Sequence, residues 1–295
     1  MKLERLGLIG YGEVGKIFAA GLRGNLASVS TWDVKFDLPE LADEQRDHAA
    51  RAGLLVTDSM AQLCQSADLM ISAVTASNTL AAAQAAAIHI RPGAIFLDLN
   101  SASPSTKQQA AALIDATGAH YVEAGVMTSV PPHGIRVPML LGGVQAVALA
   151  EVLTLWGMNA RPVSNQLGVA SAIKMCRSVM IKGLEALVIE SYVTARAYGV
   201  EDQVLPTLQE TFPSIDWAEQ GAYFFSRVVQ HGQRRAEEMR EAANTVREAG
   251  FSPFMASAIA DKQQWVADRA RTGVFQGLVK DATWQDYADR LLANK

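Results

Sequence analysis

The chain has 295 residues, of which 49% are hydrophobic and 19% charged, and its formal net charge at pH 7 is −4. This composition excludes an intrinsically disordered chain, and the length favours two domains. The acidic balance, without a long basic run, argues against a nucleic-acid partner. Cys64 and Cys176 lie far apart and form no CxxC or Cys/His cluster, so we expect reduced thiols and no metal site.

Near the N-terminus, Lys2 and Arg5 precede an apolar run that is similar to a signal peptide. Glu13 and Lys16 interrupt that run. Apolar stretches such as 81–88 are too short to cross a bilayer. We therefore expect a cytoplasmic protein without a membrane segment.

The first predicted element is a buried strand at residues 5–9, followed at once by a GxGxxG motif and by helical periodicity over 13–22. A strand, a glycine turn and a helix in this order are typical of dinucleotide binding. Gly10 allows the tight turn, Gly12 lets the backbone approach a pyrophosphate, and Gly15 lets the helix pack closely on the strand. The N–H groups at the helix start favour the phosphates. We expect cofactor contacts from the whole turn: Gly10, Tyr11, Gly12, Glu13, Val14 and Gly15.

A second predicted strand, at 29–32, ends at Asp33. At that distance from the glycine turn, an acidic residue receives the adenosine ribose hydroxyls. Val34 follows it, so no arginine stands directly after Asp33 to hold a 2′-phosphate. This favours NAD, although Lys35 leaves NADP open.

The alternation of strands and helices continues, which predicts a mostly parallel sheet with both faces covered. Further strands are expected at 54–57, 68–74, 94–97, 121–126 and 137–141. Connecting helices are expected at 40–53, 59–66, 77–90, 103–116 and 144–155. Ligands of such sheets bind beyond the carboxyl ends of the strands.

Three predicted loops lie at those strand ends, and each contains candidate site residues. Ser103 before Pro104 fits a helix cap, and position alone leaves open whether Ser101 has a functional role or also serves as a cap. The candidates in the three loops are Val74 and Thr75, then Asn100 and Ser101, then Met127 and Thr128.

After residue 165 the pattern is helical. The stretch 168–199 lacks proline and has apolar residues at helical spacing, so it predicts one long helix that joins two domains, 1–165 and 166–295. Further helices are expected at 204–210, 217–230, 233–249, 255–270 and 283–293, separated by glycines and prolines such as Pro206 and Gly250. The predicted fold class is α/β: a Rossmann-type, mostly parallel sheet followed by an all-helical second domain. We expect the long helix to contribute to substrate binding and to a homodimer or larger homo-oligomer.

Four segments together resemble the 6-phosphogluconate dehydrogenase and 3-hydroxyisobutyrate dehydrogenase superfamily of β-hydroxyacid dehydrogenases. They are GLIGYGEVG at its cofactor motif, FLDLNSASPSTK at its Asp-x-Ser-Thr substrate segment, VEAGVMTSVPPHGIRVPMLLGG at its glycine-rich loop, and GVASAIKMCRS at its catalytic lysine. The segment HGQRRAEEMREAANTVREAG further resembles a poorly characterised branch whose helical domain is of unknown function. The resemblance covers nearly the whole chain.

The resemblance implies a role for each matching position. The glycine turn and Asp33 fall on cofactor positions, and the Val74–Thr75 loop borders the cofactor. Asn100 and Ser101 lie near nicotinamide and substrate, and Lys174 is the catalytic lysine.

The chain also departs from the family pattern. The family's Ser-Gly-Gly, which helps to hold the substrate carboxylate, is replaced by Met127-Thr128-Ser129, and the two asparagines after the lysine are replaced by Arg177 and Ser178. The planar fork of Arg177 suits a carboxylate, although an interhelical ion pair is the alternative. His231 and Arg234, at the start of a charged helix, are further candidates for an anionic substrate.

Hydride transfer between a carbinol carbon and nicotinamide requires a proton to leave or reach the oxygen. A lysine can move that proton if burial and nearby positive charge lower its pKa, and Lys174 has apolar neighbours and Arg177 one turn away. The sequence thus predicts an NAD(P)-dependent oxidoreductase of a small hydroxy acid with Lys174 as general acid/base. Imine reduction, oxidative decarboxylation and a non-catalytic cofactor sensor remain alternatives.

Overall fold

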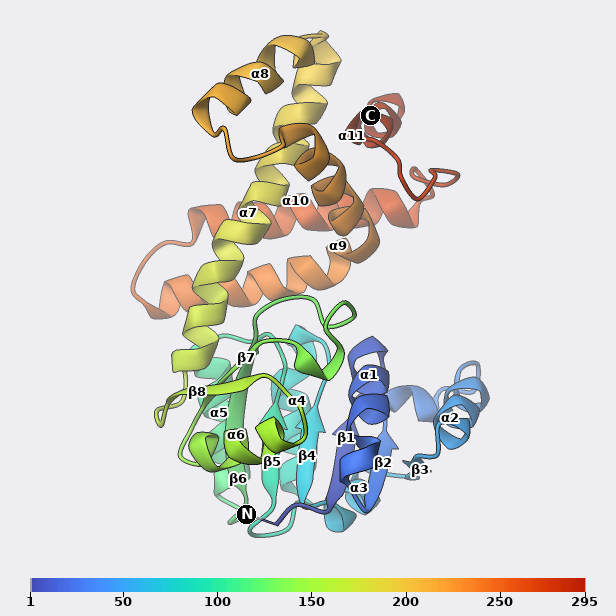
Figure 1. Cartoon of the computed structure of the whole chain (residues 1–295), viewed down its shortest axis with the longest axis vertical. Helices are drawn as coiled ribbons and strands as arrows, with labels where there is room; N and C mark the ends of the chain where they lie inside the picture. Colours follow the sequence, from blue (N-terminus) through green and yellow to red (C-terminus); the bar gives the residue numbers. More distant parts are fainter. Residues whose placement is uncertain (1, 295) are drawn as a thin grey trace. The chain divides into compact units, whose positions relative to one another are not determined.

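The computed structural model describes residues 2–294 (Figure 1). The chain divides into two compact units, of which the first ends at Met175 and the second begins at Cys176. Residues 166–175, which the domain limits predicted from the sequence assign to the second domain, cluster with the sheet in this division.

The first unit is built on an eight-stranded sheet with the order β3-β2-β1-β4-β5-β6-β7-β8. Among the described strands, every neighbouring pair is parallel except β6–β7, which confirms the mostly parallel Rossmann-type sheet. The strands are β1 (Arg5–Ile9), β2 (Ser28–Trp32), β3 (Leu55–Val56), β4 (Leu69–Ser72), β5 (Ile95–Asp98), β6 (His120–Val126), β7 (Met139–Gly142) and β8 (Ala160–Ser164).

Helices connect these strands. They are α1 (Glu13–Leu22), α2 (Ala42–Arg51), α3 (Met60–Ser66), α4 (Thr79–Ala87), α5 (Pro104–Asp115) and α6 (Ala146–Leu155), with short 3₁₀ turns at η1 (Arg23–Asn25), η2 (Val34–Asp37), η3 (Ala76–Asn78) and η4 (Gly134–Arg136). Ser103 caps α5 as expected, since its side chain accepts a hydrogen bond from the backbone N–H of Thr106 and Pro104 begins the helix.

The pattern of the sequence did not predict β8. This strand lies at the edge of the sheet, and two of its residues, Arg161 and Pro162, are exposed. Proline is tolerated at a sheet edge because its missing N–H has no ladder to complete on that side. An edge strand of this kind shows neither a buried apolar run nor clean alternation, which are the signals used to predict strands.

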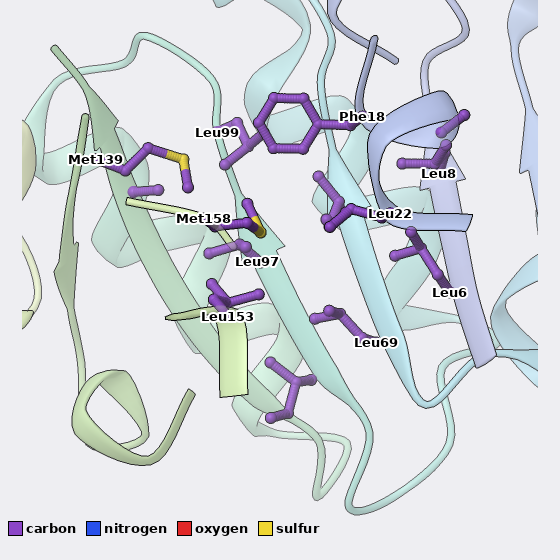
Figure 2. Close-up of a cluster of buried hydrophobic side chains, with 14 of the residues drawn as sticks. Leu6, Leu8, Phe18, Leu22, Leu69, Leu97, Leu99, Met139, Leu153 and Met158 are labelled. Carbon is purple, nitrogen blue, oxygen red and sulfur yellow. The ribbon is translucent and has the colours of Figure 1, made fainter. Parts of the chain in front are cut away.

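The central strands are mostly apolar because both faces of the sheet are covered. In β4, Leu69 and Ile71 join one buried cluster, whereas Met70 joins another. Figure 2 shows the first cluster, to which α1 contributes Phe18 and Leu22. The two apolar clusters pack against opposite faces of the sheet, and polar groups gather at the ends of its strands.

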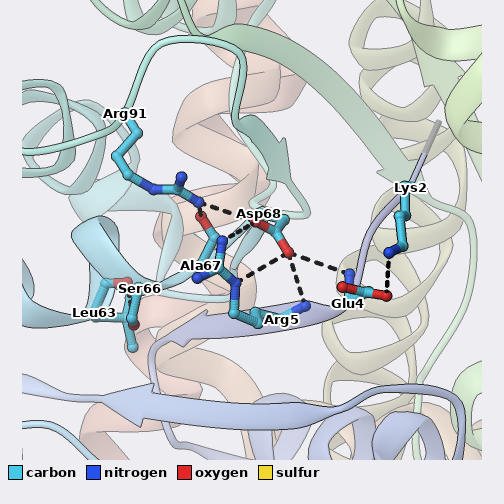
Figure 3. Close-up of polar contacts among 8 residues, drawn as sticks. All are labelled: Lys2, Glu4, Arg5, Leu63, Ser66, Ala67, Asp68 and Arg91. Carbon is cyan, nitrogen blue, oxygen red and sulfur yellow. Dashed lines mark hydrogen bonds and ion pairs between the residues drawn. The ribbon is translucent and has the colours of Figure 1, made fainter.

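At the amino ends of β1 and β4, polar contacts converge on the carboxylate of Asp68 (Figure 3). The Arg5 guanidinium donates to both oxygens, with Nη2–Oδ1 and Nε–Oδ2 distances of 2.6 and 3.2 Å. Arg91 Nη2 lies 3.0 Å from Oδ1, and the backbone N–H groups of Glu4 and Arg5 also donate to the carboxylate. The Arg5 contact, with help from the other donors, lowers the pKa of Asp68 to about 2.

The second unit is helical, as predicted. It contains most of α7 (Val169–Tyr198), followed by α8 (Glu201–Thr211), α9 (Trp217–Glu248), α10 (Phe254–Arg271) and α11 (Trp284–Ala293). The long proline-free stretch does form a single helix, α7. Among residues 2–294, no helix combines the length and the apolar character that a bilayer crossing requires.

The prediction of two helices at 217–230 and 233–249 is wrong, because α9 runs through both without a break. Gly232 lies at the predicted break, but its role is packing. A Cβ atom there would come within 2.9 Å of the Gln263 carbonyl oxygen and 3.0 Å of Ala267 Cβ, both on α10. Pro206 likewise does not separate two pieces of chain, since it lies inside α8.

Charged side chains and one amide, buried in the second unit, join α7, α9 and α10. The Arg235 guanidinium donates to the Glu185 carboxylate, with an Nε–Oε2 distance of 2.8 Å, and Gln263 Nε2 donates to the same oxygen at 3.1 Å. Lys182 pairs with Glu238 nearby. Buried charges need such partners, so this network restricts how the three helices can pack.

The apolar repeat that predicted α7 marks its buried face only in part: Val188 of that repeat is buried. Met180 and Leu187 belong to that repeat and are 67% and 54% exposed, whereas Ile189 and Tyr192 are fully buried. The periodicity therefore identified the helix, but the tertiary structure decides which of its sides packs in the core.

We expect Asp68→Asn to destabilise the first unit in a pH-dependent way. The pKa of Asp68 is lower in the folded protein than its unfolded value of about 3.9, so its contribution is complete above that value and is lost as the pH falls toward about 2. Urea unfolding should show a loss of about 1–2 kcal/mol at pH 7, shrinking between pH 4 and 2.

Asp58→Asn is the matched control, because Asp58 pairs with Arg46 but its side chain is 86% exposed. Such a pair contributes little to stability, so this variant should unfold like the wild type. A difference between Asp68→Asn and the wild type that stays constant down to pH 2 would contradict the assignment.

Candidate functional site

The glycine turn between β1 and α1 has one tight part and one open part. Gly10 has a φ of +97°, and a Cβ atom there would lie 2.6 Å from the Ala73 carbonyl oxygen. A Cβ atom at Gly15 would lie 2.1 Å from the Gly10 carbonyl oxygen. At Gly12, by contrast, none of the described residues beyond its neighbours along the chain places an atom within 4 Å of the Cβ position. Gly12 is also the N-cap of α1, so the helix start and the open space suit a pyrophosphate.

Asp33, at the end of β2, is buried and holds this turn. Its Oδ2 accepts the Tyr11 N–H at 2.6 Å and its Oδ1 accepts the Lys35 N–H at 2.9 Å. Each carboxylate oxygen has a second lone pair, so the carboxylate can still accept ribose hydroxyls. Val34 is 63% exposed and Lys35 is exposed as well.

His48 on α2 is a neighbour of this turn that the sequence did not identify. Its Nδ1 lies 2.9 Å from the Tyr11 hydroxyl, and the two rings meet edge to face. Burial raises the pKa of the Tyr11 phenol, which keeps it neutral. A histidine inside a polar helix has no motif of its own, so only the contact reveals it.

Asn100 ties together the loops that follow β4 and β5. Its Oδ1 accepts the Val74 N–H at 2.7 Å, and its Nδ2 donates to Ser72 Oγ at 2.9 Å. Its own N–H donates to Asp98 Oδ1 at 2.8 Å. The structure thus gives Asn100 a scaffolding role, and it places Thr75 exposed at the end of the same loop.

A buried ion pair that the sequence did not predict fixes the start of this loop. Lys107 on α5 is fully buried, and its Nζ lies 3.0 Å from Asp98 Oδ1 and 2.9 Å from the Asp98 carbonyl oxygen. The Tyr121 hydroxyl donates to Asp98 Oδ2 at 2.5 Å. Burial, and then the neighbouring Asp98, raise the pKa of Tyr121 well above its usual value. An aspartate at a strand end followed by a lysine in the next helix was the available signal.

The structure brings Lys174 and Ser101 into direct contact. Lys174 lies on the second turn of α7, and its Nζ is 2.5 Å from Ser101 Oγ. Both residues are half-buried. Gly125 on β6 allows α7 to approach, because a Cβ atom there would lie 2.9 Å from the Ala170 carbonyl oxygen and 3.4 Å from Lys174 Cβ.

Met127 and Thr128 follow β6, as expected. The Met127 N–H donates to the Pro138 carbonyl oxygen at 2.9 Å, and the side chain of Thr128 is exposed. Their predicted substrate contacts remain predictions.

The other candidates belong to the second unit. Arg177 is exposed and Ser178 is buried, both on the turn of α7 after Lys174. His231 and Arg234 lie in the middle of α9, so the expectation that they begin a helix is wrong, because α9 does not break at Gly232. Their predicted contacts with substrate remain predictions.

Within residues 2–294 there is no group of three or more His, Cys, Asp and Glu side chains arranged to hold a metal ion. What the carboxyl ends of β4 and β5 present instead is an amine in contact with a hydroxyl, beside a loop held by Asn100. An amine and a hydroxyl at hydrogen-bond distance can hold or exchange a proton with a ligand oxygen.

Residues 5–149 match the family described as the NAD binding domain of 6-phosphogluconate dehydrogenase, and residues 195–266 match a domain of unknown function, DUF1932. A conserved hypothetical protein from Sinorhizobium meliloti 1021 is 37% identical, with a TM-score of 0.77, over 100% of this chain and 97% of the other. A conserved protein of unknown function, described as structurally similar to 3-hydroxyacid dehydrogenases, is 31% identical, with a TM-score of 0.68, over 91% and 98%.

The 3-hydroxyisobutyrate dehydrogenase of Mycobacterium tuberculosis, solved with L-serine, is 17% identical with a TM-score of 0.72, over 98% of this chain and 99% of that one. At this level of identity the likeness concerns the fold. The two nearer relatives and the two matched domains carry the assignment. This chain belongs to the family in which an NAD binding domain of the 6-phosphogluconate dehydrogenase type precedes a DUF1932 domain.

Proposed function

We propose that this protein is an NAD(P)-dependent oxidoreductase that transfers a hydride between nicotinamide and a small hydroxy acid or its oxo form. The observation that carries the proposal is the contact between Lys174 Nζ and Ser101 Oγ. It lies at the carboxyl ends of the strands of a dinucleotide-binding sheet, where such folds bind their ligands.

Bound nicotinamide supplies the hydride acceptor or donor. The protein must then handle the proton of the substrate oxygen. In the oxidative direction the free amine of Lys174 accepts the hydroxyl proton of the substrate, and in the reductive direction its ammonium form returns it. Ser101 orients the amine through their hydrogen bond and can donate its own proton to the same oxygen.

We propose NAD as the preferred cofactor. The Asp33 carboxylate is suited to the two ribose hydroxyls and would repel a 2′-phosphate. Val34 contributes no charge at this end of β2, and the exposed Lys35 is the residue that would support NADP. Titrations of the fluorescence of NADH and NADPH would establish which is bound more tightly.

We propose a small anionic substrate and a homodimer or larger homo-oligomer. Arg177 supports the first point, because a guanidinium in place of the family's asparagine suits a carboxylate. Met180 and Leu187 support the second, since they expose apolar surface along α7. The altered Met127-Thr128-Ser129 segment keeps imine reduction as the second candidate, with oxidative decarboxylation and a cofactor sensor as further alternatives.

Gly12→Val should weaken dinucleotide binding without unfolding the protein. The φ of Gly12 is −79°, which any residue adopts, and the space around its Cβ position is open within the described part of the chain. A side chain there would occupy the place of the pyrophosphate. NADH affinity, measured by fluorescence, should fall at least about tenfold, equivalent to about 1.4 kcal/mol.

Gly24→Val is the matched control. Beyond its neighbours along the chain, no described atom lies within 4 Å of that Cβ position either, but Gly24 is in η1 rather than in the turn. It should bind NADH like the wild type. Equal affinities for Gly12→Val and the wild type would refute the proposed pyrophosphate site.

Lys174→Ala should reduce turnover by about 10²–10⁴-fold, since it removes the general acid/base. The assay is a panel of hydroxy acids, oxoacids and cyclic imines followed at the nicotinamide absorbance band. NADH affinity should stay within about twofold, because Lys174 does not belong to the glycine turn. The same panel distinguishes a hydroxy-acid dehydrogenase from an imine reductase.

Lys280→Ala, at an exposed lysine, is the control and should keep wild-type turnover. Unchanged rates in Lys174→Ala would remove its assigned role. Failure of the wild-type protein to bind either NADH or NADPH would exclude every hypothesis in which the protein is a dehydrogenase or reductase.

A further inference from the structure

Glu123 is a buried carboxylate that the chemistry above does not use. It lies on β6, its exposed fraction is 0%, and it accepts three hydrogen bonds from the backbone at the start of α7. The Gly168 and Ala170 N–H groups donate to Oε1 at 2.8 and 3.1 Å, and the Ser171 N–H donates to Oε2 at 3.3 Å.

These contacts replace a cap that α7 cannot form from its own residues. The N–H groups of Ala170 and Ser171 are the ones that a capping side chain at position 168 ordinarily satisfies. Residue 168 is a glycine with a φ of +99°, and a Cβ atom there would lie 3.0 Å from Gln108 Nε2. A side chain at 168 is therefore strained, and a residue 45 positions earlier in the chain serves as the cap.

The neighbouring strands of the sheet leave room for this carboxylate. Glu123 is paired in register with Asp98 on β5 and with Gly142 on β7. A Cβ atom at Gly142 would lie 2.5 Å from Glu123 Oε1, so only glycine leaves room for the side chain. The positive end of the α7 dipole and three N–H donors offset the burial of the charge.

The same strand also contacts the turn that carries Lys174. Gly125 follows Glu123 by two residues, so both point to the same side of the sheet. There the β6 backbone packs against Ala170 and the base of the Lys174 side chain. Glu123 binds the first turn of α7, and Gly125 allows the second turn of α7 to pack closely on β6. Together these contacts define the position of the Lys174 Cα and Cβ atoms.

We propose that Glu123 is a positioning residue for Lys174: its carboxylate anchors the first turn of α7 on β6 so that Lys174 Nζ meets Ser101 Oγ. This proposal rests on the proposed function for its kinetic consequence. The anchoring itself can be measured without turnover.

Glu123→Gln is the sharpest test because it keeps the shape of the side chain. An amide has one acceptor oxygen, so if it keeps the Gly168 and Ala170 bonds its NH₂ group faces the Ser171 N–H. We expect amide hydrogen exchange at 168–171 to accelerate at least tenfold. We also expect Lys174 to react several-fold faster with an amine-modifying reagent, measured by peptide mass spectrometry.

Leu153→Ala is the matched control for a general loss of stability. Leu153 is fully buried in the core of the same unit, on α6, and makes no hydrogen bond to α7 through its apolar side chain. This variant should lower the melting temperature while leaving exchange at 168–171 and the reactivity of Lys174 at wild-type values. Unchanged exchange and reactivity in Glu123→Gln would overturn the anchoring.

Steady-state kinetics test whether Glu123 acts on turnover through Lys174. Glu123→Gln should lower kcat roughly 10–100-fold with NADH affinity within twofold, and Glu123→Asp, one methylene shorter, should not rescue it. If Glu123 acts through Lys174, the double variant with Lys174→Ala should be no slower than Lys174→Ala alone. Additive losses would contradict positioning. Faster exchange and higher Lys174 reactivity without any effect of Lys174→Ala on turnover would instead refute the proposed function and leave the anchoring intact.

Discussion

The interaction between the Glu123 carboxylate and the N-terminus of α7 determines where this helix begins on the sheet. A charge buried against a sheet is unfavourable unless donors surround it, and the start of α7 provides three of them. The helix must therefore begin directly over β6. Gly125 and Gly142 follow from this requirement, because a side chain at either position would collide with α7 or with the carboxylate. The contact between Lys174 and Ser101 depends on the helix that this arrangement holds in place.

The two ends of the sheet use buried and partly buried carboxylates for different purposes. At the amino ends, Asp68 gathers arginines and backbone N–H groups from segments far apart in sequence, which is a stabilising arrangement distant from the strand ends where ligands bind. At the carboxyl ends, Asp98 and Glu123 stand side by side in register and each holds one partner of the amine–hydroxyl pair. Asp98 holds the loop that leads to Ser101, and Glu123 holds the helix of Lys174. Rigid support of this kind gives a reacting group a defined position.

Glycine serves opposite purposes at different points of the chain. At Gly15 and Gly232, backbone atoms of neighbouring segments occupy the space that a side chain would need. These glycines therefore allow two elements to pack closely. At Gly12 the space stays open in the described structure, which is what a ligand approaching the backbone requires. Sequence alone does not distinguish these cases unless a motif surrounds the glycine. This explains why the GxGxxG turn was assigned correctly as a turn, whereas nothing in the sequence around Gly232 indicated that it packs inside a continuous helix.

The sequence by itself determined the order and type of nearly every element through β7 and the helical character of the second unit, because buried parallel strands and long helices leave strong periodic signals. It also identified the glycine turn, Asp33, the Asn100–Ser101 loop and Lys174 as candidates, through motif context and family resemblance. Only the tertiary structure decided that β8 completes the sheet, that α9 is continuous, which side of α7 is buried, and that Glu123, Asp98 and Lys107 support the candidate site. These features rest on contacts between residues distant in the chain, such as the 45 positions between Glu123 and Gly168, and local patterns carry no record of such contacts.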